Sequence, residues 1–396
     1  MIEPLRRAFN RSWSPSDYES YKARLSAAVG AAIPFRVCET PVFLPEELRD
    51  AMLQGALEIF ELLLQPRALE HSKAAVPVAF DVPGCDAHPL FAVADFAIAE
   101  NGGHPAPRLI ELQGFPSLYA FQLVQARLCR EMLPGEPLDF LLSGLDEAGY
   151  LEVVGEAITG GLPVENVVLL DLDPPRQGTY PDFSATERLF GIRAVCATDV
   201  RKRGRELWYE RDGSTTRILR IYNRMIVDEL VEKKVELPFR LTDELDVQWA
   251  GHPNWFFRWS KHALPGLRHP LVPESQLLSE LDRVPDDLER WVLKPLFSFS
   301  GSGVNVEPTP SDIAAVPEAE RANTLLMRKV DYAPVVASPE GTRSRVEVRV
   351  MFVWRRGAPL PVMTLARLSQ GKMMGVKFNR DKTWVGSTSC LWPRGA

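Results

Sequence analysis

The chain has 396 residues, of which 45% are hydrophobic and 25% are charged, so it is long enough for two or three units with sizeable cores. Its net charge is −6 and it has no basic tail, which argues against general binding to nucleic acid or to a membrane surface. No apolar run approaches the roughly 20 residues of a transmembrane helix. The five cysteines are scattered without a Cys-x-x-Cys pair, as expected of a reduced, cytoplasmic protein.

The first region, residues 1–75, is predicted to be helical. From Pro45 to about Leu64, apolar residues recur at helical spacing and would give one helix a buried face. No pattern in this region carries chemistry. We therefore expect it to be a layer that packs on the rest of the protein or that forms a homodimer.

The second region, residues 76–133, begins with two strand-like runs separated by a turn, which predict a β-hairpin over 91–113. Because side chains alternate along a strand, Asp95 on the first strand can face Glu111 and Gln113 on the second. Two carboxylates and an amide oxygen suit a hard divalent cation such as Mg²⁺. The alternative is that Asp95 and Glu111 are independent, exposed strand residues.

A helical connector over 134–160 is predicted to lead into an α/β unit, residues 163–285. A continuous apolar run at 166–173 indicates a buried strand, and helix-like and strand-like segments alternate after it. Ligands tend to bind at strand ends in open α/β sheets, so Tyr222–Arg224 at the end of this layer is a candidate ligand contact. The rest of the unit is expected to be helical and irregular, with a short helix over Pro273–Leu281.

The stretch Trp291–Val306, inside the unit 286–330, combines an apolar run, a Ser/Gly segment and an alternating apolar run. This pattern predicts two strands joined by a flexible loop. Gly301 and Gly303 permit backbone angles that place N–H groups on a concave surface, and Lys294 adds a positive charge, so the stretch can cradle a phosphate. The alternative is a Ser/Gly hairpin beside a surface lysine.

The last region, residues 331–392, is predicted to consist of β-strands at 346–354, 360–368 and 373–388. Glu347 and Arg349 share a face of the first of these strands because they are two residues apart. They can belong to a site or form a simple charge pair between strands.

Together these segments resemble an ATP-grasp enzyme. Lys294 and the loop after it resemble the family's lid, and Lys261 ahead of Leu271-Val-Pro273 resembles its earlier lysine. Asp95 with Glu111-Leu-Gln113 resembles its metal-binding strands. The order of these motifs resembles the circularly permuted group that includes glutathionylspermidine synthase-like proteins. Two positions depart from the family pattern, because Gln113 replaces an Asn and Val93 replaces an Arg.

The resemblance covers roughly 80–125 and 163–392 and implies a mixed α+β and α/β ATP-grasp fold. It implies a core from 76–133 and 331–392, a lid at 286–330, a preceding α/β domain and an N-terminal helical region. ATP would be held by Lys261, Lys294, Ser300, Gly301, Ser302, Gly303, Met327, Lys329 and Val330. Mg²⁺ would be held by Asp95, Glu111 and Gln113. The catalytic residues would be Glu347, Arg349 and Arg367.

The activity that the resemblance implies is ATP-dependent ligation. A carboxylate of a small molecule or peptide would attack the γ-phosphate of ATP, and an amine or thiol would then displace phosphate from the acyl phosphate. Two alternatives stay open at this point. One is a nucleotide-binding regulatory protein without turnover, and the other is a phosphotransferase that acts on a small molecule.

Overall fold

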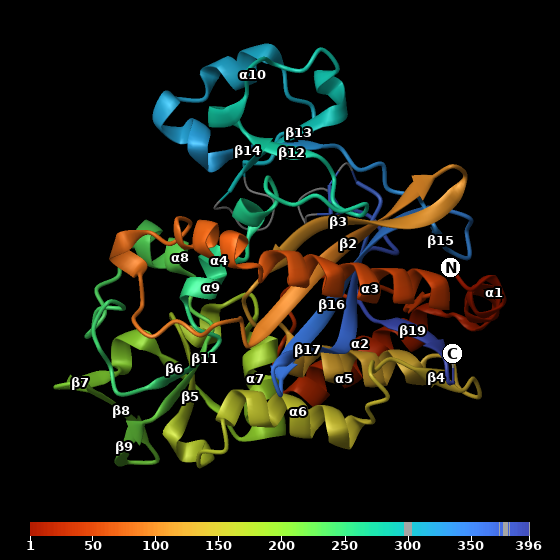
Figure 1. The fold of residues 1–396 in the computed structure, drawn as a ribbon. Helices are drawn as coiled ribbons and strands as arrows, with labels where there is room; N and C mark the ends of the chain where they lie inside the picture. The colour runs from red at the N-terminus through yellow and green to blue at the C-terminus, as the bar shows by residue number, and fades with distance from the viewer. Residues whose placement is uncertain (297–302, 372, 375–378, 380, 396) are drawn as a thin grey trace.

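A computed structural model describes residues 1–296, 303–371, 373–374, 379 and 381–395 (Figure 1). The α-helices in it are α1 Glu3–Ser12, α2 Pro15–Val29, α3 Glu46–Leu63, α4 Pro66–Lys73, α5 Tyr119–Glu131, α6 Glu147–Thr159, α7 Tyr180–Phe190, α8 Val227–Glu232, α9 Asn254–Arg258 and α10 Pro310–Ala315. The first ten strands are β1 Val42–Phe43, β2 Phe91–Asn101, β3 His104–Gln113, β4 Leu138–Asp139, β5 Val167–Asp171, β6 Arg193–Cys196, β7 Arg201–Arg203, β8 Glu206–Arg211, β9 Ser214–Ile218 and β10 Arg220–Asn223. The later strands are β11 Gln248–Ala250, β12 Ser275–Leu277, β13 Trp291–Pro295, β14 Thr324–Arg328, β15 Val336–Ala337, β16 Arg343–Arg355, β17 Ala358–Ser369, β18 Gly386–Thr388 and β19 Cys390–Pro393.

The largest sheet has the strand order β18-β17-β16-β2-β3, and β15 also pairs with β16. All of these pairs are antiparallel. The predicted hairpin is therefore joined to the late strands through β16, as expected. Apolar side chains cover both faces of the sheet: Phe352 packs in one core with α3, and Met351 packs in another with α5. Burial on both faces explains the nearly continuous apolar runs in β2 and β16.

A second, fully parallel sheet has the order β11-β10-β5-β6. The run Val167–Leu170 is completely buried, as expected for a strand covered on both faces. Helix α7 connects β5 to β6, which confirms the α/β layer predicted for this part of the chain. The hairpins of β7, β8 and β9 form a separate three-stranded sheet beside it.

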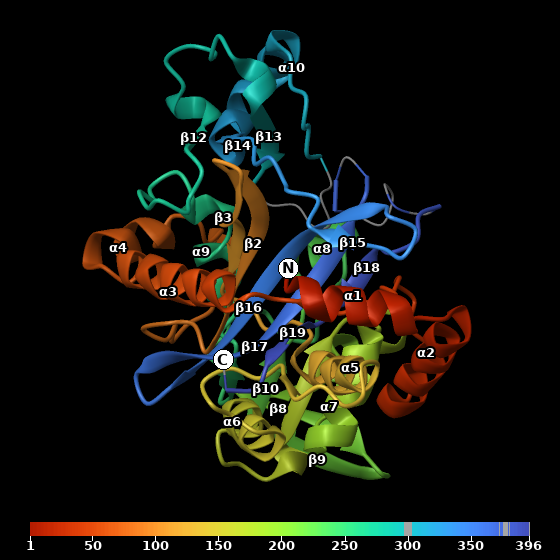
Figure 2. The same cartoon turned by 90° about the vertical axis from the view of Figure 1, so that its right-hand side faces the viewer.

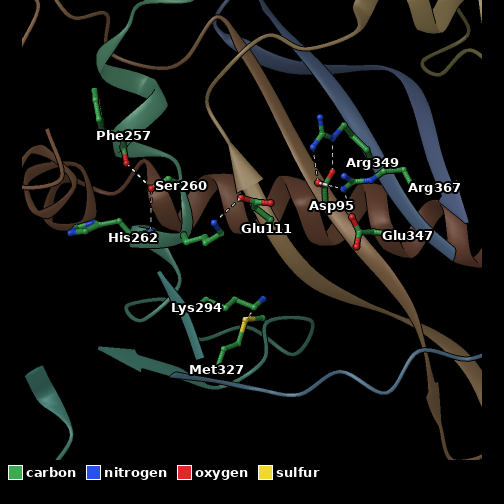
Figure 3. A network of polar contacts seen from close by, with 11 residues as sticks. Asp95, Glu111, Phe257, Ser260, His262, Lys294, Met327, Glu347, Arg349 and Arg367 are labelled. Carbon is green, nitrogen blue, oxygen red and sulfur yellow. Dashed lines mark hydrogen bonds and ion pairs between the residues drawn. The ribbon is translucent and has the colours of Figure 1, made fainter. Parts of the chain in front are cut away.

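A small three-stranded sheet, β12-β14-β13, stands above the largest sheet together with α10 (Figures 1 and 2). Its strands alternate between two environments. Trp291, Leu293 and Leu326 pack with Ile313 of α10 in a core of their own. Lys294 projects from the other face, toward the body of the protein, with Met327 on the same side (Figure 3).

Several predicted details are wrong. Pro273–Leu281 is not an α-helix, because Ser275–Leu277 pairs with β14 and a 3₁₀ turn follows. The hairpin strands are longer than expected, and they turn within two residues at Gly102 and Gly103, which both have positive φ. In the part of 373–388 that the structure describes, only Gly386–Thr388 is a strand.

After the Ser/Gly segment, the expected second strand is reduced to a single bridge between Leu293 and Asn305. The predicted phosphate contacts Ser300, Gly301 and Ser302 lie outside the described residues. Among the described residues, no helix combines the length and the apolarity that a membrane span requires. All five cysteines are described, and none of them is joined in a disulfide.

Candidate functional site

The charged residues predicted for the site meet on one face of the largest sheet. Asp95 lies opposite Glu111 on β3 and opposite Arg349 on β16, and Glu347 lies opposite Arg367 on β17. Since directly opposed side chains share a face, all five project on the same side (Figure 3). Gln113, two residues beyond Glu111, lies opposite Val93 and belongs to the same face.

Two arginines hold the carboxylate of Asp95. The Arg349 guanidinium donates two parallel hydrogen bonds of 2.6 and 2.7 Å to its oxygens, and Arg367 donates a third of 3.0 Å. Burial alone would raise the pKa of Asp95, but the two guanidiniums lower it below its ordinary value. Asp95 is 1% exposed, so it lies beneath the arginines as an ionised, paired carboxylate.

Glu347, the second carboxylate that contacts Arg367, is also paired. We refer to Asp95, Glu111, Glu347, Arg349 and Arg367 as the charged cluster. Its carboxylate pairs with Arg367 and also accepts a hydrogen bond of 2.9 Å from the hydroxyl of Tyr332. The sequence left open whether Glu347 and Arg349 belong to a site or form a simple charge pair between strands. In the structure, the register of β16 and β17 sets Glu347 opposite Arg367, while Arg349 reaches Asp95 on β2, so each pairs with a residue of another strand.

Two lysines approach Glu111 from different parts of the chain. Lys261, in the 3₁₀ turn Lys261–Ala263, has its Nζ 3.8 Å from a Glu111 carboxylate oxygen. Burial lowers the pKa of Lys294 on β13; the charge of Glu111 opposes that shift and the charge of Lys261 adds to it. Burial also raises the pKa of Glu111, which Lys261 opposes. One carboxylate is thus electrostatically coupled to both lysines.

Local structure explains the position of Lys261. The Ser260 hydroxyl donates to the carbonyl of Phe257 at 2.8 Å and accepts from the His262 N–H at 3.2 Å, which fixes the turn. The carbonyl of Trp259 accepts from the Gly114 N–H at 2.9 Å and so ties the turn to the end of β3. The aromatic segment before Lys261 is a packing cluster, with Trp255 and Trp259 fully buried.

The remaining predicted nucleotide contacts differ in their environment. Met327 is buried, and its sulfur accepts a hydrogen bond of 3.3 Å from Lys294. Lys329 and Val330 follow β14 in the connection to the largest sheet, and the Lys329 side chain is exposed. Gly303 has a φ of +70°, and a Cβ there would lie 2.8 Å from Pro295, so only glycine fits without a shift.

Of the three predicted metal ligands, Asp95 is already engaged by the two arginines. The oxygens of Asp95 already accept three charge-assisted hydrogen bonds from arginines, whereas a metal needs open oxygen donors. Among the described residues, no three His, Cys, Asp or Glu side chains form a group that could hold a metal ion. The remaining positions, 297–302, 372, 375–378, 380 and 396, contain no Asp, Glu, His or Cys. Glu111 and Gln113 remain as neighbouring oxygen donors near the lysines.

The strand end Tyr222–Arg224 is engaged internally. Arg224 is buried and pairs with Asp182 of α7. The Asp182 carboxylate also accepts from the N–H groups of Ala120 and Phe121, at 3.1 and 3.0 Å, at the start of α5. The Asp182 carboxylate thus neutralises Arg224 and also accepts hydrogen bonds from free backbone N–H groups at the N-terminus of α5. The sequence indicated Arg224 as a candidate ligand contact, but no pattern in it predicted that Asp182 would be its partner.

Two cavities lined by described residues lie away from the lysines. One, of about 610 Å³, is at the carboxyl ends of β5 and β6 and is lined in part by Asp173, Tyr180 and Cys196. The other, of about 570 Å³, is lined in part by Trp249 and His252. Neither cavity is lined by residues of the charged cluster, so the cluster is a candidate site on chemistry rather than on cavity size.

Comparison with known proteins bears on the fold. No protein-family model matches the sequence, and no curated protein matches it. Among solved structures, the chain is similar to a glutathione synthetase-like effector from Globodera pallida in its apo form, with a TM-score of 0.58. The two sequences are 12% identical, and the match covers 96% of this chain and 97% of that one. The fold is glutathione synthetase-like. It extends over nearly the whole of both chains, so the several sheets described above form one known mixed α and β architecture.

Proposed function

We propose that the protein is an ATP-dependent ligase with a circularly permuted ATP-grasp arrangement, which joins a carboxylate to an amine through an acyl phosphate. The observation that carries the proposal is that Lys261, with its Nζ 3.8 Å from Glu111, and Lys294, which projects from the small sheet toward the body of the protein, lie on the two sides of one region (Figure 3). These lysines come from the body and from the small sheet, so an anion held by both would lie between the two parts. A polyphosphate supplies the negative charge that such a pair needs.

In this proposal, the residues of the site have different roles according to their charge and position. Lys261 and Lys294 would hold the phosphates of ATP, and backbone groups near Met327–Val330 would hold the adenine. Arg349 and Arg367 would hold the transferred phosphoryl group or the substrate carboxylate, because a guanidinium binds either with two parallel hydrogen bonds. Attack of the carboxylate on the γ-phosphorus releases ADP, and the amine then displaces phosphate. Positioning and charge neutralisation supply the rate, without a covalent protein intermediate.

The test is a screen for ADP release with amino acids, peptides and dicarboxylates as acids, and with amino acids and polyamines as amines. Amide products are identified by mass spectrometry, and hydroxylamine traps an acyl phosphate as a hydroxamate. Lys294→Ala should lose activity and ATP-induced stabilisation, while Lys73→Ala, which removes an exposed lysine on α4, should retain both. ADP release that is insensitive to Lys294→Ala would refute the proposal.

A second candidate is a nucleotide-binding protein without ligase turnover. The specific observation in its favour is that both Asp95 and Glu347 are already neutralised by arginines. Such a protein would be stabilised by ATP but would release no ADP with any acid and amine. Formation of a phosphorylated product without an amide would instead indicate a phosphotransferase.

A further inference from the structure

We propose that Asp95 is a positioning residue, which holds Arg349 and Arg367 side by side as one binding surface for an oxyanion group of the substrate. This inference rests on the proposed function and deepens it, since it assigns how the two guanidiniums are fixed. It replaces the metal-ligand role that the sequence indicated for Asp95.

The two guanidiniums make different hydrogen bonds to the carboxylates. Arg349 uses its Nε and one terminal nitrogen on Asp95, at 2.6 and 2.7 Å, so the guanidinium plane is fixed by two bonds. Arg367 uses one terminal nitrogen for both Asp95 and Glu347. An arginine offers five N–H donors, so each guanidinium keeps an edge that these carboxylates do not occupy.

Asp95 lies deeper in the protein than the two arginines. The side chain of Asp95 is 1% exposed, that of Arg349 is 9% exposed and that of Arg367 is 41% exposed. Exposure therefore increases from the carboxylate outward. A ligand that enters from solvent meets Arg367 before it can reach Asp95, so Asp95 acts through the arginines and not on the ligand.

Arg367 carries a hydrogen-bond donor that is not satisfied within the described part of the chain. The Nε of Arg367 is buried and has no hydrogen-bond partner among the described residues. A buried donor without a partner is unfavourable. This guanidinium belongs to the more exposed of the two arginine side chains, so an oxyanion that replaces the atoms covering Nε would supply the missing acceptor.

The net charge of the site distinguishes three possible roles for Asp95. With all groups ionised, the lysines and arginines of the site contribute four positive charges, and Asp95, Glu111 and Glu347 contribute three negative charges, so the net charge is +1. Asp95→Asn raises it to +2. If the only effect of Asp95 on a bound anion were electrostatic repulsion, the variant would bind anions more tightly. If Asp95 positions the arginines, the variant binds anions more weakly despite the added positive charge. If Asp95 were a metal ligand, the variant would need a higher Mg²⁺ concentration for ATP to stabilise it.

The experiment measures binding of inorganic phosphate and of acetate by calorimetry, and the Mg²⁺ concentration at which ATP stabilises the protein half-maximally. Asp95→Asn is expected to weaken phosphate or acetate binding roughly tenfold, the effect of losing one charge-assisted hydrogen bond, and to leave the Mg²⁺ midpoint within about twofold. The oxyanion whose affinity falls more identifies whether the arginines serve the phosphoryl group or the carboxylate. Glu111→Gln, on the facing strand, is the matched comparison and is expected to shift the Mg²⁺ midpoint without weakening phosphate binding.

Tighter phosphate binding by Asp95→Asn, or a shift of its Mg²⁺ midpoint equal to that of Glu111→Gln, would overturn the inference. Should Asp95→Asn fail to fold, Arg349→Gln is compared with the double variant D95N/R349Q, in which neither buried partner is left charged. An equal Mg²⁺ midpoint in these two proteins supports the inference, and a higher midpoint in the double variant overturns it. Wild-type protein that binds ATP and phosphate but never releases ADP would refute the ligase and leave the role of Asp95 standing. Wild-type protein that binds no phosphate or acetate overturns the inference.

Discussion

The hydroxyl of Tyr332 donates a hydrogen bond of 2.9 Å to Glu347 and thereby joins the connection after the small sheet to the charged cluster. The same connection is fixed by its backbone: Ala333 donates to Ile98 at 2.9 Å, and Glu100 donates to Asp331 at 3.2 Å. The chain that leaves β14 is thus bound to residues 98–100 of β2 before it enters β15. This attachment is one of the links between the largest sheet and the small sheet that carries Lys294.

We predict that Tyr332→Phe destabilises the protein by about 1–3 kcal/mol, because it removes a donor from a buried carboxylate. Tyr150→Phe is the control. The Tyr150 hydroxyl donates to the neutral carbonyl of Tyr119, also at 2.9 Å, so its loss should cost less, about 0.5–1.5 kcal/mol. Urea unfolding of both variants measures the difference. An equal decrease in the free energy of unfolding would show that the charge of Glu347 does not strengthen its hydrogen bond with Tyr332.

We predict that ATP affinity falls as the pH rises above neutrality, through the lowered pKa of Lys294. Only the protonated amine neutralises phosphate, and burial makes Lys294 lose its proton at a lower pH than an exposed lysine would. Lys294→Arg should flatten this dependence, because a guanidinium stays protonated throughout the range. Calorimetric titrations of ATP from pH 7 to pH 10 provide the measurement. A parallel decline in wild type and Lys294→Arg would assign the titration to another group.

We predict that Asp171 makes the protein less stable as the pH rises. Burial raises the pKa of this carboxyl to about 7, although Arg224 opposes the shift. The folded state then holds a proton that the unfolded state releases at about pH 4, so the free energy of unfolding decreases between about pH 4 and pH 7. Asp171→Asn cannot ionise and should therefore gain stability relative to wild type on going from pH 5 to pH 8.

The control for this prediction is Asp173→Asn, which changes an exposed carboxylate two residues away. Its stability relative to wild type should be nearly the same at both pH values. Thermal unfolding at pH 5 and at pH 8 gives both comparisons. A difference between Asp171→Asn and wild type that does not change with pH would contradict the raised pKa.

We predict that Gly114→Ala destabilises the protein by about 1–3 kcal/mol through overpacking and weakens ATP binding. A Cβ at this buried position would lie 2.7 Å from the backbone carbonyl oxygen of Trp255, which cannot move aside like a side chain. The resulting shift acts on the end of β3, where Glu111 and Gln113 lie. Gly178→Ala is the control, because its Cβ would meet nothing within 4 Å. Equal melting temperatures for the two variants would contradict the close contact.

The elements that carry a strong local pattern could be predicted from the sequence. Helix α3 follows from the spacing of Met52, Ala56 and Ile59, which are all buried. The hairpin of β2 and β3 and the shared face of Asp95 and Glu111 follow from the two-residue period of strands. The two-residue turn was missed although Gly102-Gly103 carries the usual hairpin signal.

The pairing partners of the charged residues could not be predicted in the same way. Whether Arg349 meets Glu347 or Asp95 depends on the register between β16 and β2, which no local pattern encodes. The same holds for Asp182 and Arg224, which belong to different elements of the α/β layer. The strand β12 has only three residues, too few for a period to be recognised.

The order of strands in the largest sheet has a consequence for synthesis of the chain. The hairpin of β2 and β3 ends at residue 113, but its partner β16 begins only at residue 343. During translation the hairpin therefore remains without its partner strand, with an unpaired edge and apolar residues on both faces, until the α/β layer and the small sheet have been synthesised. Contacts so distant in sequence slow folding, and an exposed strand edge favours aggregation. The nascent protein is consequently a candidate client of chaperones that shield hydrophobic segments until the late strands emerge.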